Sequence, residues 1–118
     1  MTADARIPVT ILPDRDAVAA WLRAGAAAAL LTDAAGPTPG FVATEHFRPG
    51  PAHRFGCACC AGRSPAAAAL DRLFQGRARN RTGWFDRLAV LAITAAAQAE
   101  VAAALDDDVL TRARYRRA

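Results

Sequence analysis

Lysine is absent from this sequence of 118 residues, and all 15 of its basic side chains are arginines. Aromatic residues make up only 7%, and methionine occurs once. Alanine dominates the hydrophobic fraction of 53% and buries little area per residue, so a core must depend on a few larger side chains. We expect these to be Leu12, Trp21, Leu30, Leu31, Leu70, Leu73, Phe74, Leu88, Val90, Leu91 and Ile93.

Long apolar runs are missing too. No segment approaches the roughly 20 apolar residues that cross a bilayer. Residues 1–6 lack the basic start and apolar stretch of a secretory signal. We therefore expect a cytoplasmic protein with no membrane partner, in which thiols stay reduced. The cysteines are three in number and lie within four positions, which argues against a disulfide framework.

The net charge of +4 is distributed along the chain, with arginines interleaved with aspartates. The densest basic group is Arg112, Arg114, Arg116 and Arg117, and it is typical of a solvated helix end. We therefore expect no nucleic-acid partner.

Strand and helix patterns alternate along the chain. Runs rich in β-branched or apolar residues predict strands, and capping residues followed by apolar faces predict helices. The length allows one domain, spanning 1–118. Alternation predicts an α/β fold of three layers, with a mainly parallel sheet and flanking helices. The expected strands are 7–12, 28–32, 41–44 and 86–93, and helices are expected from Asp14 to about Gly25, from Ser64 to about Gly76, up to Leu105, and briefly after 106–108.

Cys57, Cys59 and Cys60 form the one cluster of residues that suggests a specific chemistry. Thiolates bind zinc or copper(I), and three neighbouring sulfurs can supply most of such a site. Flanking glycines let the backbone turn sharply, while Arg54 and Arg63 would favour deprotonated sulfur. Thiol redox chemistry and inert packing remain as alternatives.

The fourth ligand is open. His53 lies four residues before Cys57 and is the first candidate, while His46 and Glu45 lie further back. Water or a partner's side chain would also complete the shell, as an open site suited to metal delivery requires. Zinc is the expected metal, with another soft or divalent ion as the alternative.

Residues 56–63 resemble the Gly-Cys-x-Cys-Cys-x-x-Arg segment of CobW-type metallochaperone GTPases, which are related to HypB and UreG. Residues 6–12 resemble the first strand of that family. Residues 85–88 resemble the Phe-Asp before its next strand, and 106–116 the stretch after the following helix. The resemblance implies half of a P-loop NTPase-like domain, zinc at the cysteines, and a metalloprotein awaiting metal as partner.

Two departures from the family bear on activity. After Leu12 the chain continues as 13–17, Pro-Asp-Arg-Asp-Ala, where the family has a glycine-rich phosphate loop ending in Gly-Lys-Thr-Thr. Residues 93–96, Ile-Thr-Ala-Ala, stand where the family has Glu-Thr-Thr-Gly. A phosphate loop needs glycines and a lysine, so we expect no nucleotide binding and no GTPase activity.

The sequence thus predicts a non-enzymatic, CobW-like metal-binding protein with a metallochaperone or metal-homeostasis role. The alternative is a pseudoenzyme that docks on a full-length GTPase or another partner, with vestigial cysteines. The chain stops about where the family continues to further strands and a C-terminal domain. A half-sized sheet leaves an unpaired edge, so we expect a homodimer or a partner protein.

Overall fold

The computed structural model describes residues 4–50 and 63–118. Five parallel strands form one sheet in the order β3-β2-β4-β1-β5. The predicted α/β class with a parallel sheet and flanking helices is therefore confirmed. The strands are β1 (Ile7–Leu12), β2 (Ala29–Thr32), β3 (Ala43–His46), β4 (Leu88–Leu91) and β5 (Tyr115–Arg117), and the helices are α1 (Arg15–Arg23), α2 (Pro65–Ala78), α3 (Ala95–Asp107) and α4 (Val109–Arg114).

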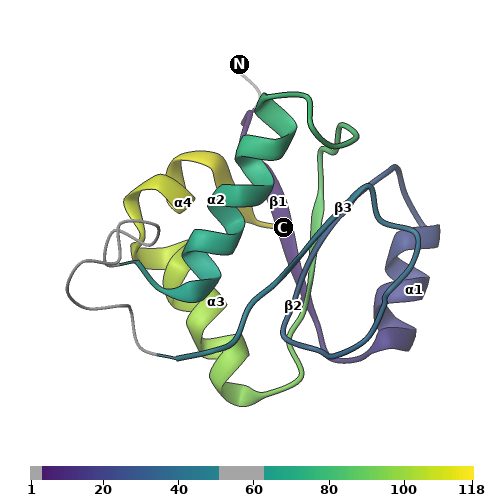
Figure 1. The fold of residues 1–118 in the computed structure, drawn as a ribbon, viewed down its shortest axis with the longest axis horizontal. Coiled ribbons are helices and arrows are strands. Elements are labelled where there is room, and N and C mark those ends of the chain that lie inside the picture. Colours follow the sequence, from purple (N-terminus) through teal and green to yellow (C-terminus); the bar gives the residue numbers. More distant parts are fainter. Residues whose placement is uncertain (1–3, 51–62) are drawn as a thin grey trace.

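The helices cover both faces of the sheet, which gives the three expected layers (Figure 1). One face packs against α2 and α3, and its core includes Leu31, Leu70 and Val101. The other face packs against α1 and the β2–β3 connection, through Val18 and Leu30. Burial on both faces explains why β2 and β4 are apolar at nearly every position rather than at alternate ones.

Chain direction follows from the uniform handedness of parallel connections. The chain leaves β1 and β2 toward the α1 face, and it leaves β4 toward the α3 face. Strand β4 lies between β1 and β2 in the sheet, so neighbouring strands send their chains to opposite faces. Such a reversal opens space at the carboxyl edge of the sheet, where α/β proteins commonly bind ligands.

Helix starts agree with the capping residues in the sequence. Asp14, Ser64, Thr94 and Asp108 each accept a hydrogen bond from the backbone N–H three residues on, at the starts of α1, α2, α3 and α4. Pro65 occupies the first turn of α2, where no N–H is needed.

Four local predictions are wrong. Ile93 is 53% exposed, because β4 ends at Leu91 and the chain has already left the sheet. The third strand occupies 43–46 instead of 41–44, and α2 continues through Ala78, past Gly76. The arginine-rich end of the chain is also more than a solvated helix end, because Tyr115–Arg117 pairs with β1 as strand β5.

Candidate functional site

The predicted metal ligands Cys57, Cys59, Cys60 and His53 lie in the segment 51–62, outside the described residues. The structure does describe the residues that flank this segment on both sides and those that they contact, and we call them the frame. The frame consists of Gly50, the start of α2, and parts of α3 and α4.

Glu100 of α3 holds both sides of the frame together. Its Oε1 accepts a hydrogen bond from the backbone N–H of Gly50 at 2.9 Å, and its Oε2 accepts one from Ala66 N–H at 2.9 Å. Because both oxygens belong to one carboxylate, the backbone just before the cysteine segment and the first turn of α2 lie close together. Gly50 and the first turn of α2 therefore share one anchor.

The N-terminus of α2 points to the same place. Ser64 Oγ accepts from Ala67 N–H at 3.2 Å, and the 14-residue helix follows without an acidic residue in its first turn. Peptide dipoles give a helix N-terminus a partial positive charge that favours nearby anions. A thiolate held beside this end would be stabilised in the same way.

Arg63 anchors the returning chain. Its Nε and Nη2 donate to the two carboxylate oxygens of Asp108 at 3.1 and 2.7 Å, and its Nη1 lies 3.7 Å from Asp71 Oδ2. The Arg63 side chain is only 17% exposed, so these ion pairs are partly shielded from solvent. The expectation that Arg63 favours thiolates concerns cysteines outside the described residues; within them, its charge is shared by Asp108 and Asp71.

Asp108 is the main acid of this anchor. Partial burial opposes its ionisation, but the hydrogen bonds from Arg63 and Thr111 outweigh that cost and hold the pKa of Asp108 below its ordinary value. Its Oδ2 accepts from both Thr111 N–H and Thr111 Oγ, at 3.0 and 2.8 Å. The same carboxylate thus caps α4 and fixes Arg63.

A hollow of about 310 Å³ lies beside the frame. It is lined by residues of α3, by Asp107 and Asp108, and by Arg63 and Ser64 where the chain returns. Both oxygens of Glu100 already accept hydrogen bonds, and Asp108 is occupied by Arg63. These two carboxylates therefore hold the frame together rather than face the hollow as free ligands.

The carboxyl edge of the sheet is the second place where a site was expected. Asp33, directly after β2, accepts from Ile93 N–H at 2.9 Å and from Thr94 Oγ at 3.1 Å. At the end of β1, Asp14 Oδ1 accepts from Ala17 N–H at 2.8 Å. The protein's own carboxylates therefore occupy the amides and hydroxyl on which an anion would depend here.

His46 and Glu45 were weaker candidates for the fourth ligand. Glu45 accepts from Arg72 Nε at 2.9 Å on the outer surface. His46 is exposed at the end of β3, beside Asp33 and Arg48 around a hollow of about 350 Å³. Within residues 4–50 and 63–118, no three His, Cys, Asp or Glu side chains gather closely enough to hold a metal ion.

The fold and frame define a three-layer parallel α/β protein with a cysteine-bearing connection between β3 and α2. Comparisons with protein-family models, with curated proteins and with solved structures give no match. Among the helices that the structure describes, none combines the length and apolar character needed to cross a bilayer.

Glu100 is the residue of the frame that sequence reasoning missed. It is the one acidic residue between Thr94 and Leu105, in a helix otherwise rich in alanine. A single carboxylate inside an apolar helix is a usable signal, because a charge there needs a partner. The partners themselves are backbone groups distant in sequence, which no local pattern indicates.

Proposed function

We propose that this protein is a non-enzymatic metal-binding protein of CobW-like character, with a metallochaperone or metal-homeostasis role. Cys57, Cys59 and Cys60 bind the ion, His53 is the fourth ligand, and zinc is the first candidate. The observation that carries the proposal is the double anchorage on Glu100, which brings both sides of the cysteine segment together. The three cysteines lie within four positions between these anchored sides.

Electrostatics of the frame support thiolate chemistry at this place. The segment returns at the N-terminus of a 14-residue helix, which favours negative charge. The oxygens of the nearest frame carboxylates are occupied, since Glu100 accepts two amide hydrogen bonds and Asp108 pairs with Arg63. A divalent cation bound by three thiolates carries net negative charge, which the partial positive charge of a helix N-terminus stabilises.

Loss of nucleotide chemistry belongs to the same proposal. Phosphate loops use free backbone N–H groups at the start of the first helix. Here the Asp14 carboxylate accepts from that helix start, and a second carboxylate, Asp16, lies in its first turn. Both would repel a triphosphate, which supports a binding protein over a GTPase.

Metal analysis of protein purified under reducing conditions tests the proposal. We expect about one zinc per chain, lost in the triple variant C57S/C59S/C60S, because serine does not supply a thiolate. His53→Ala should weaken zinc binding by at least about 10- to 100-fold, the range seen when a group that merely supports a ligand is removed, while the matched control His46→Ala should leave it unchanged. Wild-type protein with three free thiols and no micromolar zinc affinity would refute the proposal.

The pseudoenzyme alternative has one observation in its favour. Among the described strands, β3 and β5 each pair with one neighbour only, so both edges of the sheet are open to a partner or a second copy. If the triple serine variant forms the same homodimer or recruits the same partner as the wild type, and the wild type binds no metal, the alternative holds.

A further inference from the structure

Trp84 is the most exposed aromatic residue among the large hydrophobic residues that the structure describes, at 61%. It lies in the connection between α2 and β4, and its Nε1 donates to Asp86 Oδ1 at 3.0 Å. An indole usually buries its ring and leaves only its N–H near water. Here the N–H is bound and the ring is exposed, which is the reverse arrangement.

Arg77 covers one face of this indole. Its Cζ lies 3.6 Å from the centroid of the Trp84 ring. Its Nε donates to the Phe85 carbonyl at 2.7 Å and its Nη2 to Asp86 at 3.1 Å, so the guanidinium is held in place. With one face covered and the ring edge fixed, the exposure of Trp84 falls mainly on its second face. The ring is therefore a flat platform, ordered and open to solvent.

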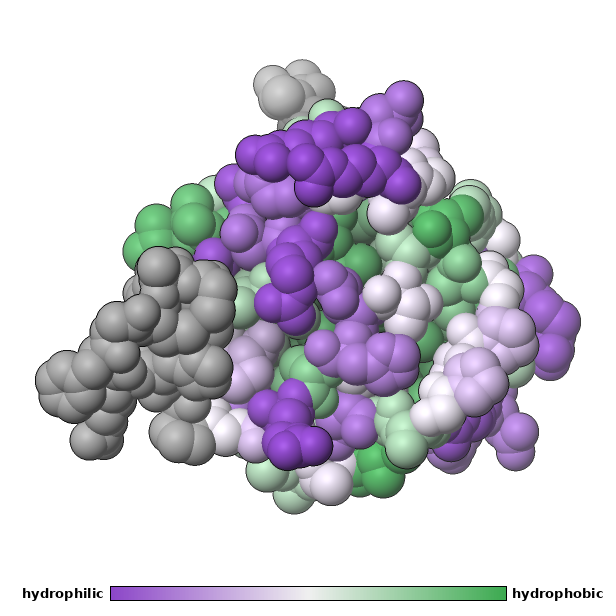
Figure 2. All heavy atoms as spheres, viewed as in Figure 1, coloured by the Kyte–Doolittle hydropathy of each residue, from purple (hydrophilic) through white to green (hydrophobic). Residues whose placement is uncertain are grey.

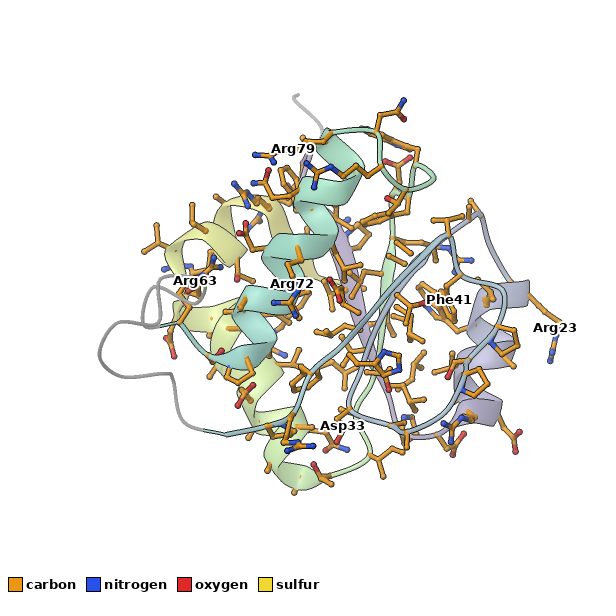
Figure 3. The ribbon with its side chains drawn as sticks, viewed as in Figure 1. Arg23, Asp33, Phe41, Arg63, Arg72 and Arg79 are labelled. Atoms are coloured by element: carbon orange, nitrogen blue, oxygen red, sulfur yellow. The ribbon has the colours of Figure 1, made fainter. Side chains whose placement is uncertain are left out.

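Arg79 and Arg81 are both exposed and lie five and three residues before Trp84, in the connection that carries it. No described carboxylate lies within ion-pair distance of either, in contrast to Arg63 and Arg114, which pair with acids. The turn carrying them is ordered: Asn80 adopts φ 57°, and Arg81 N–H donates to Gly76 O at 2.8 Å. Figure 3 shows Arg79 at the end of α2, and Figure 2 shows hydrophilic side chains gathered at that end.

The position of the turn is set by the sheet. A Cβ added at Gly83 would lie 3.0 Å from Val42 Cβ, so glycine lets the connection approach the chain entering β3. The backbone that carries the two cations and the open ring is thereby positioned before any ligand arrives. Pre-ordering lowers the entropic cost of binding.

We propose that this platform, formed by Arg77, Arg79, Arg81 and Trp84, binds single-stranded nucleic acid. A base stacks on the open face of Trp84, and phosphates lie beside Arg79 and Arg81. Stacked rings with neighbouring cations are the common means of binding single strands, since every base has a flat face. A base in a duplex is not free to stack in this way.

An acidic peptide fits less well. It would pair with Arg79 and Arg81 but leave the ring of Trp84 without a role. The described carboxylate at the platform, that of Asp86, is already shared by Arg77 and the indole N–H. The sequence led us to expect no nucleic acid because its arginines are spread along the chain; the fold stacks Arg77 on an exposed aromatic ring and leaves Arg79 and Arg81 exposed in the same connection.

This platform is independent of the proposed metal site. It lies at the C-terminal end of α2, whereas the cysteine segment joins the N-terminal end. The helix has 14 residues, so the two ends are roughly 20 Å apart at 1.5 Å per residue. Failure of one proposal leaves the other intact.

Fluorescence provides the test, in a Trp21→Phe background that leaves Trp84 as the sole tryptophan. Titration with oligo(dT) and oligo(U) of about 12 nucleotides should quench the emission saturably. Trp84→Leu, measured by anisotropy of labelled oligonucleotide, should weaken binding by about 5- to 150-fold. R79S/R81S should weaken it and reduce the salt slope by about 0.7 for each phosphate that the arginines no longer neutralise. Comparison of the two oligonucleotides tells RNA from DNA as the source.

The matched control is R23S/R48S, which removes the same charge at two exposed arginines away from the platform (Figure 3 labels Arg23). It should bind as the wild type does, and circular dichroism should show every variant folded. If R79S/R81S and R23S/R48S lose the same affinity for the oligonucleotide, binding depends only on the net charge of the protein, and the proposal is overturned. An unchanged affinity of Trp84→Leu for the oligonucleotide would also overturn it. So would polyglutamate that displaces the oligonucleotide as well as unlabelled oligonucleotide does, without quenching the Trp84 emission.

Discussion

The two ends of helix α2 use the same residue type in opposite ways. At the N-terminal end, Arg63 pairs with Asp108 and Asp71 and is 17% exposed. At the C-terminal end, Arg79 and Arg81 are exposed and no described acid pairs with them. The arginine at the N-terminal end is paired with carboxylates, whereas the arginines at the C-terminal end present their positive charge to solvent.

The difference comes from what packs beside each end. Helices α3 and α4 supply Glu100 and Asp108 near the start of α2. The far end meets aromatic rings instead, and Arg77 lies over Trp84 and near Phe74 and Phe85. At the start of α2 the arginine is bound between carboxylates, whereas at the far end Arg77 is held by rings and one exposed acid, Asp86, and Arg79 and Arg81 have no described acidic partner. The chemistry of an arginine here is set by its neighbours, not by its position in the sequence.

The strongest test of this difference between the two ends of α2 is Arg63→Met, which keeps much of the length of the side chain and removes its charge. We expect it to lower the free energy of unfolding by about 2–4 kcal/mol, because Asp108 loses a bidentate partner in a partly shielded place. Urea unfolding measures the loss. Arg79→Met is the matched control and should change stability by less than about 0.5 kcal/mol. Similar losses for both would mean that the two ends do not differ.

Asp108→Asn tests the charge of the acid partner separately from its cap. Asparagine still caps α4, so the loss at neutral pH should be about 1–3 kcal/mol, the contribution of hydrogen bonds to a charged group. The folded-state pKa of Asp108 is depressed, so its contribution is fully present above the unfolded value of about 3.9 and is lost as pH falls through the folded pKa. The difference between wild type and variant should therefore shrink below about pH 4, measured by unfolding at several pH values. A difference that does not change with pH would contradict this role.

Glu100→Gln should have a smaller effect, about 1–2 kcal/mol. The amide has one oxygen, so it can accept from Gly50 or Ala66 but not well from both. Hydrogen exchange at the Gly50 amide should speed up with the change. Glu45→Gln, a partly exposed acid paired with Arg72, is the control and should cost less than about 1 kcal/mol. An equal cost for both would mean that the double anchorage contributes nothing.

Much of the fold was predictable because its signals are local. Ser64 followed by Pro65 marks the start of α2, and Asp14 marks that of α1, since a cap needs only the residues next to it. Strand boundaries were less predictable. Ile93 continues an apolar run, yet β4 ends at Leu91 where its hydrogen-bonding partners β1 and β2 end.

Strand β5 shows what local patterns miss. Tyr115–Arg117 has two arginines in three residues and no apolar run. It becomes a strand because β1 offers a free edge and because Tyr115 is buried, its hydroxyl donating to the Leu70 carbonyl at 2.8 Å. Burial also raises the pKa of the Tyr115 hydroxyl, which keeps it a neutral donor.

The sequence by itself determined the α/β class, the helix starts and the presence of three neighbouring thiols, because periodicity, caps and composition act within a few residues. Only the tertiary structure decided that one Glu100 carboxylate joins Gly50 to the first turn of α2 and that Arg77 stacks on Trp84. Those arrangements depend on contacts between residues far apart in the chain, and such contacts exist only once the sheet has set where each helix ends.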